Sequence, residues 1–299
     1  MNAIEVEQIH KSFGSIKAVI NADFSVEKGA LFGLIGPDGA GKTTLFRILT
    51  TLLIPDQGKA TIEGLDSVRD YRKIRRMIGY MPGKFSLYQD LSVEENLRFF
   101  ATIFGTTIRA NYHLIKDIYT QIEPFRKRRA GKLSGGMKQK LALCCALIHQ
   151  PKVLFLDEPT TGVDAVSRAE FWEMLQRLKV EGITIIVSTP YMDEAALCER
   201  IALIQEGRIL KIDEPQNITD SYPHPLYLVR ARHFYHLLKD LRQQKFTRRV
   251  EPFGEYLHLT TDEQTAMSNI RQCLEGLGHT EIELQATKAT IEDVFLNLM

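Results

Sequence analysis

Apolar residues fall into strand-like patterns at four places before residue 190. Residues 4–13, IEVEQIHKSF, alternate between apolar and polar side chains, which predicts a strand with one buried face. Residues 30–36 (ALFGLIG), 152–157 (KVLFLD) and 183–189 (ITIIVST) are instead largely apolar throughout. Short runs of this kind are typical of strands buried on both faces of a sheet. The first two thirds of the chain is therefore expected to be an α/β domain.

Helical spacing is strongest between residues 83 and 150. In LSVEENLRFFATIFG, Ser92 is expected to cap a helix, and Glu95 three residues later completes a capping box. In LSGGMKQKLALCCALIHQP, Ser134 and two glycines precede a second helix, which should end before Pro151. We expect the apolar side chains of both helices to be buried, namely Phe99, Phe100, Phe104, Leu141, Cys144, Cys145 and Ile148.

The pattern changes in the last third of the chain. Residues 200–212, RIALIQEGRILKI, predict two short strands joined by a turn, and the breaker DEPQNITDSYPHP follows them. From Leu226 onward, strand-like and helix-like segments alternate, which favours a small α+β module of the order βαββαβ. We therefore expect one domain at residues 1–220 and an accessory module at residues 221–299.

Composition excludes several classes of protein. At 299 residues the chain is long enough for about two domains. Its 38 basic and 37 acidic residues nearly balance, which argues against nucleic acid as a partner, and the basic run RKRR at 126–129 is interpreted as a solvated face. The four cysteines lie in apolar helical patterns without metal-ligand spacing, which suits a reducing cytosol. No segment approaches 18 apolar residues, so no membrane span is expected.

A phosphate-binding loop follows the apolar run at 30–36. Gly36, Gly41, Lys42 and Thr43 have the spacing G-x-x-x-x-G-K-[ST], between a predicted strand and a predicted helix. The glycines let backbone N–H groups converge on phosphates, and the helix N-terminus adds its positive end. Lys42 would reach the β- and γ-phosphates, and the Thr43 hydroxyl would bind Mg²⁺. An ordinary glycine-rich turn is the competing interpretation, which the flanking elements disfavour.

An acidic pair ends the apolar run at 152–157. In KVLFLDEPTTGVD, the predicted strand delivers Asp157 and Glu158 to its carboxyl end. Such a pair often marks only the end of a strand at a loop. Behind a phosphate-binding loop, it suggests that Asp157 binds the metal ion and Glu158 polarises the attacking water. Ser134 and the glycines after it could form a second anion site at a helix start, or a simple N-cap.

These motifs together resemble those of a known family. The phosphate-binding loop, LSGGMKQK, LFLDEP and GVD occur in the order and spacing of the nucleotide-binding subunits of ABC transporters, most closely the drug-exporter type. The likeness covers roughly residues 3–215. It implies a P-loop NTPase (RecA-like) core with an inserted α-helical subdomain at about 83–150, followed by the α+β module.

The resemblance also implies how such a subunit binds its ligands. Two cassettes would form a head-to-tail dimer, with ATP and Mg²⁺ held between the loop of one and the signature of the other. The second cassette could be an identical chain or a different one. Adenine would stack on Phe13, with Val19 nearby. The partner permease would be a separate integral-membrane polypeptide, and this chain would be cytoplasmic and peripheral on the inner face of the plasma membrane. The expected nucleotide contacts are Phe13, Val19, Gly36, Pro37, Asp38, Gly39, Ala40, Gly41, Lys42, Thr43 and Thr44, together with Ser134, Gly135, Gly136 and Asp164.

Two departures from the family pattern concern catalysis. Gly83 stands where the family has a glutamine that contacts Mg²⁺ and the attacking water, and Gln89 is a poorly placed substitute. Pro190 stands where the family has a histidine that contacts the γ-phosphate, and a proline ring can neither donate a hydrogen bond nor titrate. Smaller departures are Asp38 in place of asparagine and Lys140 in place of arginine. We therefore expect a hydrolysis-impaired site, paired with a catalytically complete cassette.

Two alternatives to an export ATPase remain open at this level. One is a non-transport ABC protein acting on nucleic acid or ribosomes, although a second cassette and a charged linker are not present in the sequence. The other is an ATP-dependent assembly module without turnover. Phe85, Leu87 and Tyr88 could likewise belong to the core or line a groove for a permease helix.

Overall fold

The computed structural model describes residues 1–262 and 265–299. The chain divides into two compact units, Met1–Pro215 and Gln216–Met299, where the sequence suggested a boundary near residue 220. The phosphate-binding loop and the acidic pair both lie in the first unit.

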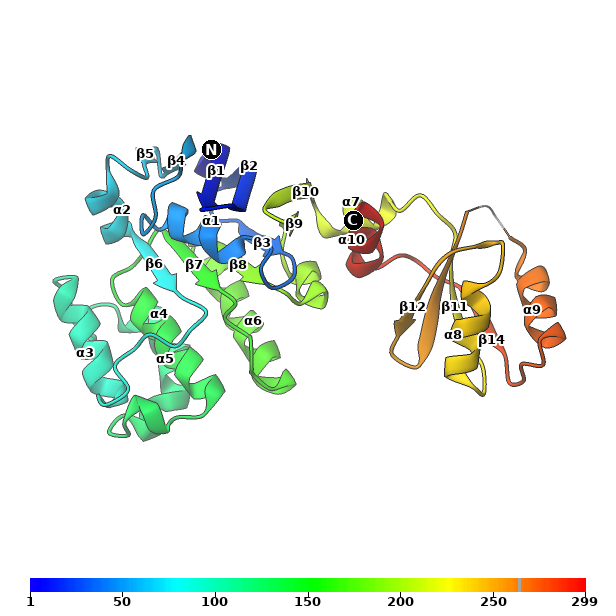
Figure 1. Ribbon diagram of the computed structural model, residues 1–299. Helices are drawn as coiled ribbons and strands as arrows, with labels where there is room; N and C mark the ends of the chain where they lie inside the picture. Colours follow the sequence, from blue (N-terminus) through cyan, green and yellow to red (C-terminus); the bar gives the residue numbers. More distant parts are fainter. Residues whose placement is uncertain (263–264) are drawn as a thin grey trace. The chain divides into compact units, whose positions relative to one another are not determined.

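Two sheets organise the first unit (Figure 1). The larger sheet has the strand order β10-β9-β3-β8-β7-β6, and all its neighbours pair in parallel except β10 with β9. Its strands are β3 (Leu31–Ile35), β6 (Ile78–Met81), β7 (Val153–Asp157), β8 (Thr184–Thr189), β9 (Arg200–Gln205) and β10 (Arg208–Asp213). The smaller, antiparallel sheet has the order β2-β1-β4-β5, formed by β1 (Asn2–Phe13), β2 (Ile16–Glu27), β4 (Gln57–Ile62) and β5 (Leu65–Asp66).

The main core of this unit surrounds helix α1 (Lys42–Leu49), which contacts β2 and β4 of the small sheet and β7 of the large one. Every residue of β3, β7 and β8 is buried, as their apolar runs predicted. Phe46 of α1 meets Phe155 of β7 edge to face, with ring centroids 5.9 Å apart. Because parallel strands buried on both faces align their carboxyl ends, β3, β7 and β8 end at the same edge of the sheet.

The helices of the first unit are α2 (Tyr71–Met77), α3 (Val93–Ile103), α4 (Tyr112–Ile122), α5 (Gly135–Leu147) and α6 (Ala165–Val180). Three short 3₁₀ segments complete them, η1 (Glu123–Phe125), η2 (Ala130–Lys132) and η3 (Met192–Leu197). Helices α3, α4 and α5 group together on one side of the sheets, where the inserted helical subdomain was expected (Figure 1). The capping box of Ser92 and Glu95 and the N-cap of Ser134 are both present, which confirms these predictions.

The prediction that the phenylalanines of α3 are core residues was wrong. Phe99, Phe100 and Phe104 are only half-buried, although Leu97 on the same helix is fully buried. The ring of Phe104 stacks on His149 with centroids 3.7 Å apart. Phe100 and Phe104 therefore line a surface cavity, whereas the predicted apolar residues of α5 are buried.

The second unit contains β11 (Leu226–Arg230), α8 (Phe234–Arg242), β12 (Thr247–Phe253), β13 (Tyr256–Thr261), α9 (Met267–Gly276) and β14 (Glu283–Ala286). This is the predicted βαββαβ order, and the strands form an antiparallel sheet of order β12-β13-β11-β14. Helix α7 (Pro215–Asp220) precedes these elements and α10 (Ile291–Leu298) follows them. The unit has its own hydrophobic core, which includes Val229, Leu237 and Leu259.

None of the helices in the described part of the chain is both long enough and apolar enough to span a bilayer. Residues 126–129, the basic run, are exposed, as a solvated face requires.

Candidate functional site

The phosphate-binding loop runs from the end of β3 to the start of α1 and passes close to neighbouring backbone. A Cβ atom at Gly36 would lie 2.1 Å from the carbonyl oxygen of Ile204, and one at Gly41 would lie 2.3 Å from that of Ala18. Gly41 also has a φ of 104°, a conformation that other residues rarely adopt. Both glycines are thus required to bring the loop against its neighbours and to begin α1.

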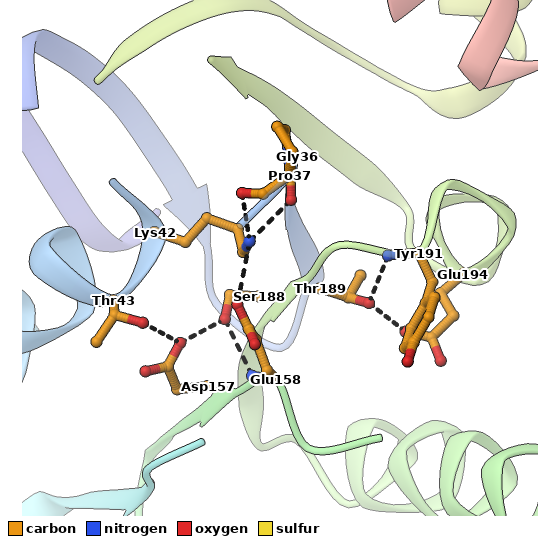
Figure 2. Close-up of polar contacts among 10 residues, drawn as sticks. All are labelled: Gly36, Pro37, Lys42, Thr43, Asp157, Glu158, Ser188, Thr189, Tyr191 and Glu194. Carbon is orange, nitrogen blue, oxygen red and sulfur yellow. Dashed lines mark hydrogen bonds and ion pairs between the residues drawn. The ribbon is translucent and has the colours of Figure 1, made fainter. Parts of the chain in front are cut away.

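Lys42 is the cation at the centre of this loop. Its side chain is 2% exposed, and Nζ donates hydrogen bonds to the carbonyl oxygens of Gly36 (2.8 Å) and Pro37 (2.9 Å). Nζ also lies 3.1 Å from Oε1 of Glu158, as Figure 2 shows. A buried ammonium group needs such acceptors because removing it from water is costly. The loop therefore holds one positive charge at a fixed position beside the acidic pair.

Asp157 and Thr43 meet on the other side of Lys42 (Figure 2). The Thr43 hydroxyl donates to Oδ1 of Asp157 at 3.2 Å, and the Ser188 hydroxyl donates to the same oxygen at 2.6 Å. Burial, and then the negative charge of Asp157, raise the pKa of the neighbouring Tyr80 to about 12. A hydroxyl and a carboxylate at this spacing are the hard oxygen ligands that Mg²⁺ prefers, so the residues present fit that ion.

Glu158 follows in an unusual backbone conformation, with a φ of 51°. Its N–H donates to both the carbonyl oxygen and the hydroxyl oxygen of Ser188, at 3.0 and 3.1 Å. A left-handed conformation in a non-glycine residue costs on the order of 1 kcal/mol or more and persists only where the surroundings enforce it. Ser188 is thus a residue that the sequence interpretation missed, since it holds Asp157 through its hydroxyl and Glu158 through its backbone.

A cavity of about 400 Å³ opens in front of these groups. It brings together the predicted Gly39, Gly41, Lys42, Thr43, Thr44 and Glu158 with the unpredicted Ile16, Lys17, Ala18 and Glu206. Of the other predicted loop residues, Pro37 is half-buried, Asp38 is exposed and Ala40 is buried. The loop and the catalytic glutamate therefore share one cavity.

The expected adenine contacts lie on the hairpin of β1 and β2. Phe13 is 48% exposed and pairs with Ile16, which is 68% exposed, at the tip of the hairpin. Val19 is only 1% exposed and packs in the core, so its side chain does not reach the cavity. Ile16 therefore stands where Val19 was expected. Regular alternation along β2 would place Val19 on the face opposite Phe24, and only the register shift between Ala22 and Val19 in the pairing with β1 brings it to the buried side.

The signature residues lie apart from that cavity. Ser134 is exposed and caps α5 by accepting a hydrogen bond from the N–H of Met137 at 3.3 Å. The Cβ position of Gly136 is 3.0 Å from the Ser167 hydroxyl, and that of Gly135 is 3.6 Å from the Gly162 carbonyl oxygen. Asp164 caps α6, and the hydrogen bond from the Ser167 N–H lowers the pKa of its carboxyl group. Signature and GVD loop thus form a second exposed cluster.

The two departures from the family pattern flank the acidic pair. Gly83 is exposed, and a Cβ atom there would lie 3.1 Å from the Asp157 carbonyl oxygen and 3.7 Å from the Glu158 Cβ. Pro190 directly follows Ser188 and Thr189 at the end of β8. The carbonyl oxygen of Gln89 instead accepts a hydrogen bond from the N–H of Gly131, on the helical side of the unit. Position 83 therefore lies beside the acidic pair, but its residue has no side chain to reach it.

Comparison with known proteins shows which family the chain resembles. The family model described as ABC transporter matches residues 19–161. The probable multidrug ABC transporter ATP-binding protein YbhF of Escherichia coli is 40% identical over 286 residues, covering 94% of this chain and 49% of that protein. The chain thus spans about half the length of that relative.

Two further likenesses extend over most of each partner. Nod factor export ATP-binding protein I of a Rhizobium species is 35% identical over 301 residues, which cover 99% of this chain and 96% of that protein. Among solved structures, cbiO1 from Clostridium perfringens, part of the ABC transporter complex cbiONQ, superimposes with a TM-score of 0.66 at 26% identity. That match covers 74% of this chain and 91% of the solved one. The Nod factor export protein is related to this chain over nearly the full length of both proteins. The chain therefore belongs to the ATP-binding proteins of ABC transporters, whose characteristic reaction is ATP hydrolysis.

Proposed function

We propose that this chain is the ATP-binding subunit of an export system, in which it binds MgATP in a head-to-tail dimer of cassettes. The observation that supports the dimer best is the separation of the two phosphate-binding features. Lys42, Thr43 and Glu158 line one cavity, whereas the exposed Ser134 and Gly135 and the half-buried Gly136 lie outside that lining. A second cassette facing the cavity would bring its own signature amides to the phosphates.

The residues of the cavity divide the chemistry among themselves. Thr43 and Asp157 would hold Mg²⁺, which neutralises charge on the phosphates when bound. Lys42 would bind the β- and γ-phosphate oxygens through its ammonium group, and the amides at the start of α1 would bind them through N–H groups. Glu158 would orient the attacking water and accept its proton. Phe13 and Ile16 would pack against adenine.

The permease would dock on a second cavity, of about 300 Å³, between the sheet and the helical subdomain. Its walls are mostly apolar, and they include Leu87, Phe100 and Phe104 among the side chains that the sequence left undecided or assigned to the core. The half-buried rings of Phe100 and Phe104, together with the exposed Leu52 in the same lining, suit a helix laid into a groove. Docking there would place the chain at the inner face of the membrane. The names of its relatives suggest a drug or another small molecule as the exported substrate.

The site of this chain is proposed to hydrolyse ATP slowly. Gly83 and Pro190 flank Asp157 and Glu158 without supplying an amide or an imidazole, and losing one positioned polar group typically costs on the order of a hundredfold in rate. The signature residues, in contrast to Gly83 and Pro190, match the family pattern. The chain would therefore complete the site of a partner cassette better than it operates its own, and a homodimer would contain two slow sites.

The test is made on the complex purified with its membrane permease. Ser134→Arg in this chain should abolish most ATP turnover, because it blocks the partner's site, whereas Lys42→Ala should reduce turnover less. Equal inhibition by the two substitutions would contradict the asymmetric arrangement. Failure of the chain to purify with any integral-membrane protein would contradict the export function itself.

A further inference from the structure

A buried carboxylate that has no place in the chemistry described above lies beside the site, next to the end of β8 (Figure 2). Glu194 belongs to η3, immediately after β8, and is 2% exposed. Its Oε2 accepts hydrogen bonds from the hydroxyls of Thr189 (2.5 Å) and Thr160 (3.1 Å), and its Oε1 accepts one from Nε of Arg168 (3.1 Å). Both oxygens of the carboxylate are thus occupied by donors from outside η3.

These donors come from three separate parts of the fold. Thr189 is the last residue of β8, Thr160 lies in the loop after the acidic pair, and Arg168 is on the first turns of α6. The Arg168 guanidinium also lies 4.2 Å from the centroid of the Tyr191 ring. The Tyr191 N–H donates to the Thr189 hydroxyl oxygen at 3.1 Å, which Figure 2 shows beside Glu194. Residues 189–194, here called the β8–η3 segment, are therefore bound to α6 and to the loop through one carboxylate.

The same residues are joined to the nucleotide cavity by backbone hydrogen bonds. The Gly36 N–H donates to the Thr189 carbonyl oxygen at 3.2 Å, and the Thr161 N–H donates to the Glu158 carbonyl oxygen at 3.2 Å. Glu158 is two residues before Thr160, and its backbone is already in the left-handed region. Any movement of Thr160 is therefore transmitted to a residue whose conformation must be enforced by its neighbours.

The network also continues toward the exposed signature cluster. After Thr160 the loop passes Gly162, whose carbonyl oxygen faces Gly135, and reaches Ser167 beside Gly136. The N–H of Val163 donates to the Thr160 carbonyl oxygen at 3.3 Å. Glu194 thus anchors the base of a loop that begins at the catalytic glutamate and ends against the signature glycines.

We propose that Glu194 is a positioning residue for ATP hydrolysis: it fixes the loop of residues 160–164 relative to the phosphate-binding loop, and so sets the position of the Glu158 carboxylate. This role rests on hydrolysis at the proposed site. The contacts of Glu194 would hold the β8–η3 segment in place. A contact from residue 190 to phosphate would not be needed for this, since the Pro190 side chain carries no group that could bind phosphate. Removing the carboxylate leaves two hydroxyls and a guanidinium competing for buried acceptors, so the loop should loosen.

The test uses the complex of this chain with its permease, in which any different partner cassette has its own catalytic glutamate replaced by glutamine, so that only the site of this chain hydrolyses ATP. Single-turnover hydrolysis, MgATP affinity and hydrogen exchange are measured for each variant. In Glu194→Gln and Thr160→Val, the hydrolysis rate at saturating MgATP should fall roughly 10- to 100-fold, as expected for misplacement of a catalytic group. The Kd for MgATP should change by less than about threefold, because Lys42 and Thr43 are untouched. The amides of Thr161 and Val163 should exchange faster in both variants.

Two controls separate positioning from general destabilisation. Thr160→Ser keeps the hydroxyl and should restore the rate that Thr160→Val loses. Asp193→Asn alters the neighbouring residue, which also contacts Arg168 but whose side chain is 74% exposed, and should hydrolyse ATP at the unmodified rate. An unchanged rate in Glu194→Gln, or a rate loss accompanied by an equal loss of MgATP affinity, would overturn the proposal. Absence of hydrolysis in the unmodified complex would instead overturn the proposed function on which it rests.

Discussion

Nζ of Lys42 lies 3.1 Å from Oε1 of Glu158, so the cation expected to bind phosphate and the carboxylate expected to act on water form an ion pair with each other. When a triphosphate enters the cavity, its oxygens must compete with Glu158 for that ammonium group. With the roles proposed above, Glu158 would be free to orient the water only once Lys42 is bound to phosphate.

Glu158→Gln should therefore bind MgATP more tightly than the unmodified chain. The substitution removes the anion that competes for Lys42, and an increase in affinity of roughly two- to tenfold is expected for a charge-assisted contact of this kind. Titration calorimetry measures the effect. Glu206→Gln provides the matched control, since Glu206 lines the same cavity but makes no ion pair with Lys42. An equal gain in that control would assign the effect to overall charge rather than to the ion pair.

Gly83→Gln combined with Pro190→His should raise the ATPase rate of the isolated chain. The first substitution needs a shift of only a few tenths of an ångström, because its Cβ would lie 3.1 Å from the Asp157 carbonyl oxygen. It places an amide beside the acidic pair, and the second places an imidazole at the end of β8. Steady-state phosphate release measures the gain, and each single substitution should give less than the pair. No gain in the double variant would mean that other residues limit the rate.

Sequence motifs predicted the groups that meet at the carboxyl ends of β3 and β7, because those groups follow apolar runs whose parallel pairing is nearly obligatory. Lys42, Thr43, Asp157 and Glu158 were found in this way. Glu194 could not be, because MDEAAL has no distinctive pattern and its burial depends on donors from three distant segments. Val19 was misplaced for a related reason, since the irregular pairing of β1 with β2 shifts which residues face the cavity.

Leu52→Glu should weaken assembly with the permease without affecting the cassette itself. Leu52 is 56% exposed and lines the cavity between the sheet and the helical subdomain, so the new carboxylate would meet an apolar partner segment without disturbing the core. Co-purification with the permease should fall at least tenfold, while MgATP affinity remains unchanged. Ile54→Glu is the control, because Ile54 is 66% exposed nearby in sequence but does not line the cavity. Similar losses in both variants would argue against this cavity as the docking site.

Asp293 should make the second unit sensitive to acid. Its carboxylate caps α10 together with Thr290 and accepts a hydrogen bond from Nδ1 of His258, which lies 2.8 Å away on β13. Burial alone would raise the pKa of Asp293, but the hydrogen bonds from His258 and Thr290 outweigh it and lower the pKa below its ordinary value of 3.8. A carboxyl group whose pKa is lowered on folding contributes stability that is complete above its unfolded pKa and is lost as pH falls through the folded one.

Asp293→Asn should therefore melt at a lower temperature than the unmodified chain at pH 6, and the difference should shrink as the pH falls below 3.8 toward 2. Asparagine keeps the size of the side chain but loses the negative charge, so the variant has no such contribution to lose. Differential scanning calorimetry of the full chain at several pH values measures the gap for the transition of the second unit. Asp262→Asn serves as the comparison, because Asp262 pairs with Arg248 at the surface with 58% of its side chain exposed and should shift that transition little at any pH. A gap for Asp293→Asn that stayed constant from pH 6 to pH 2 would show that size or hydrogen-bond geometry, rather than charge, gives Asp293 its role at the start of α10.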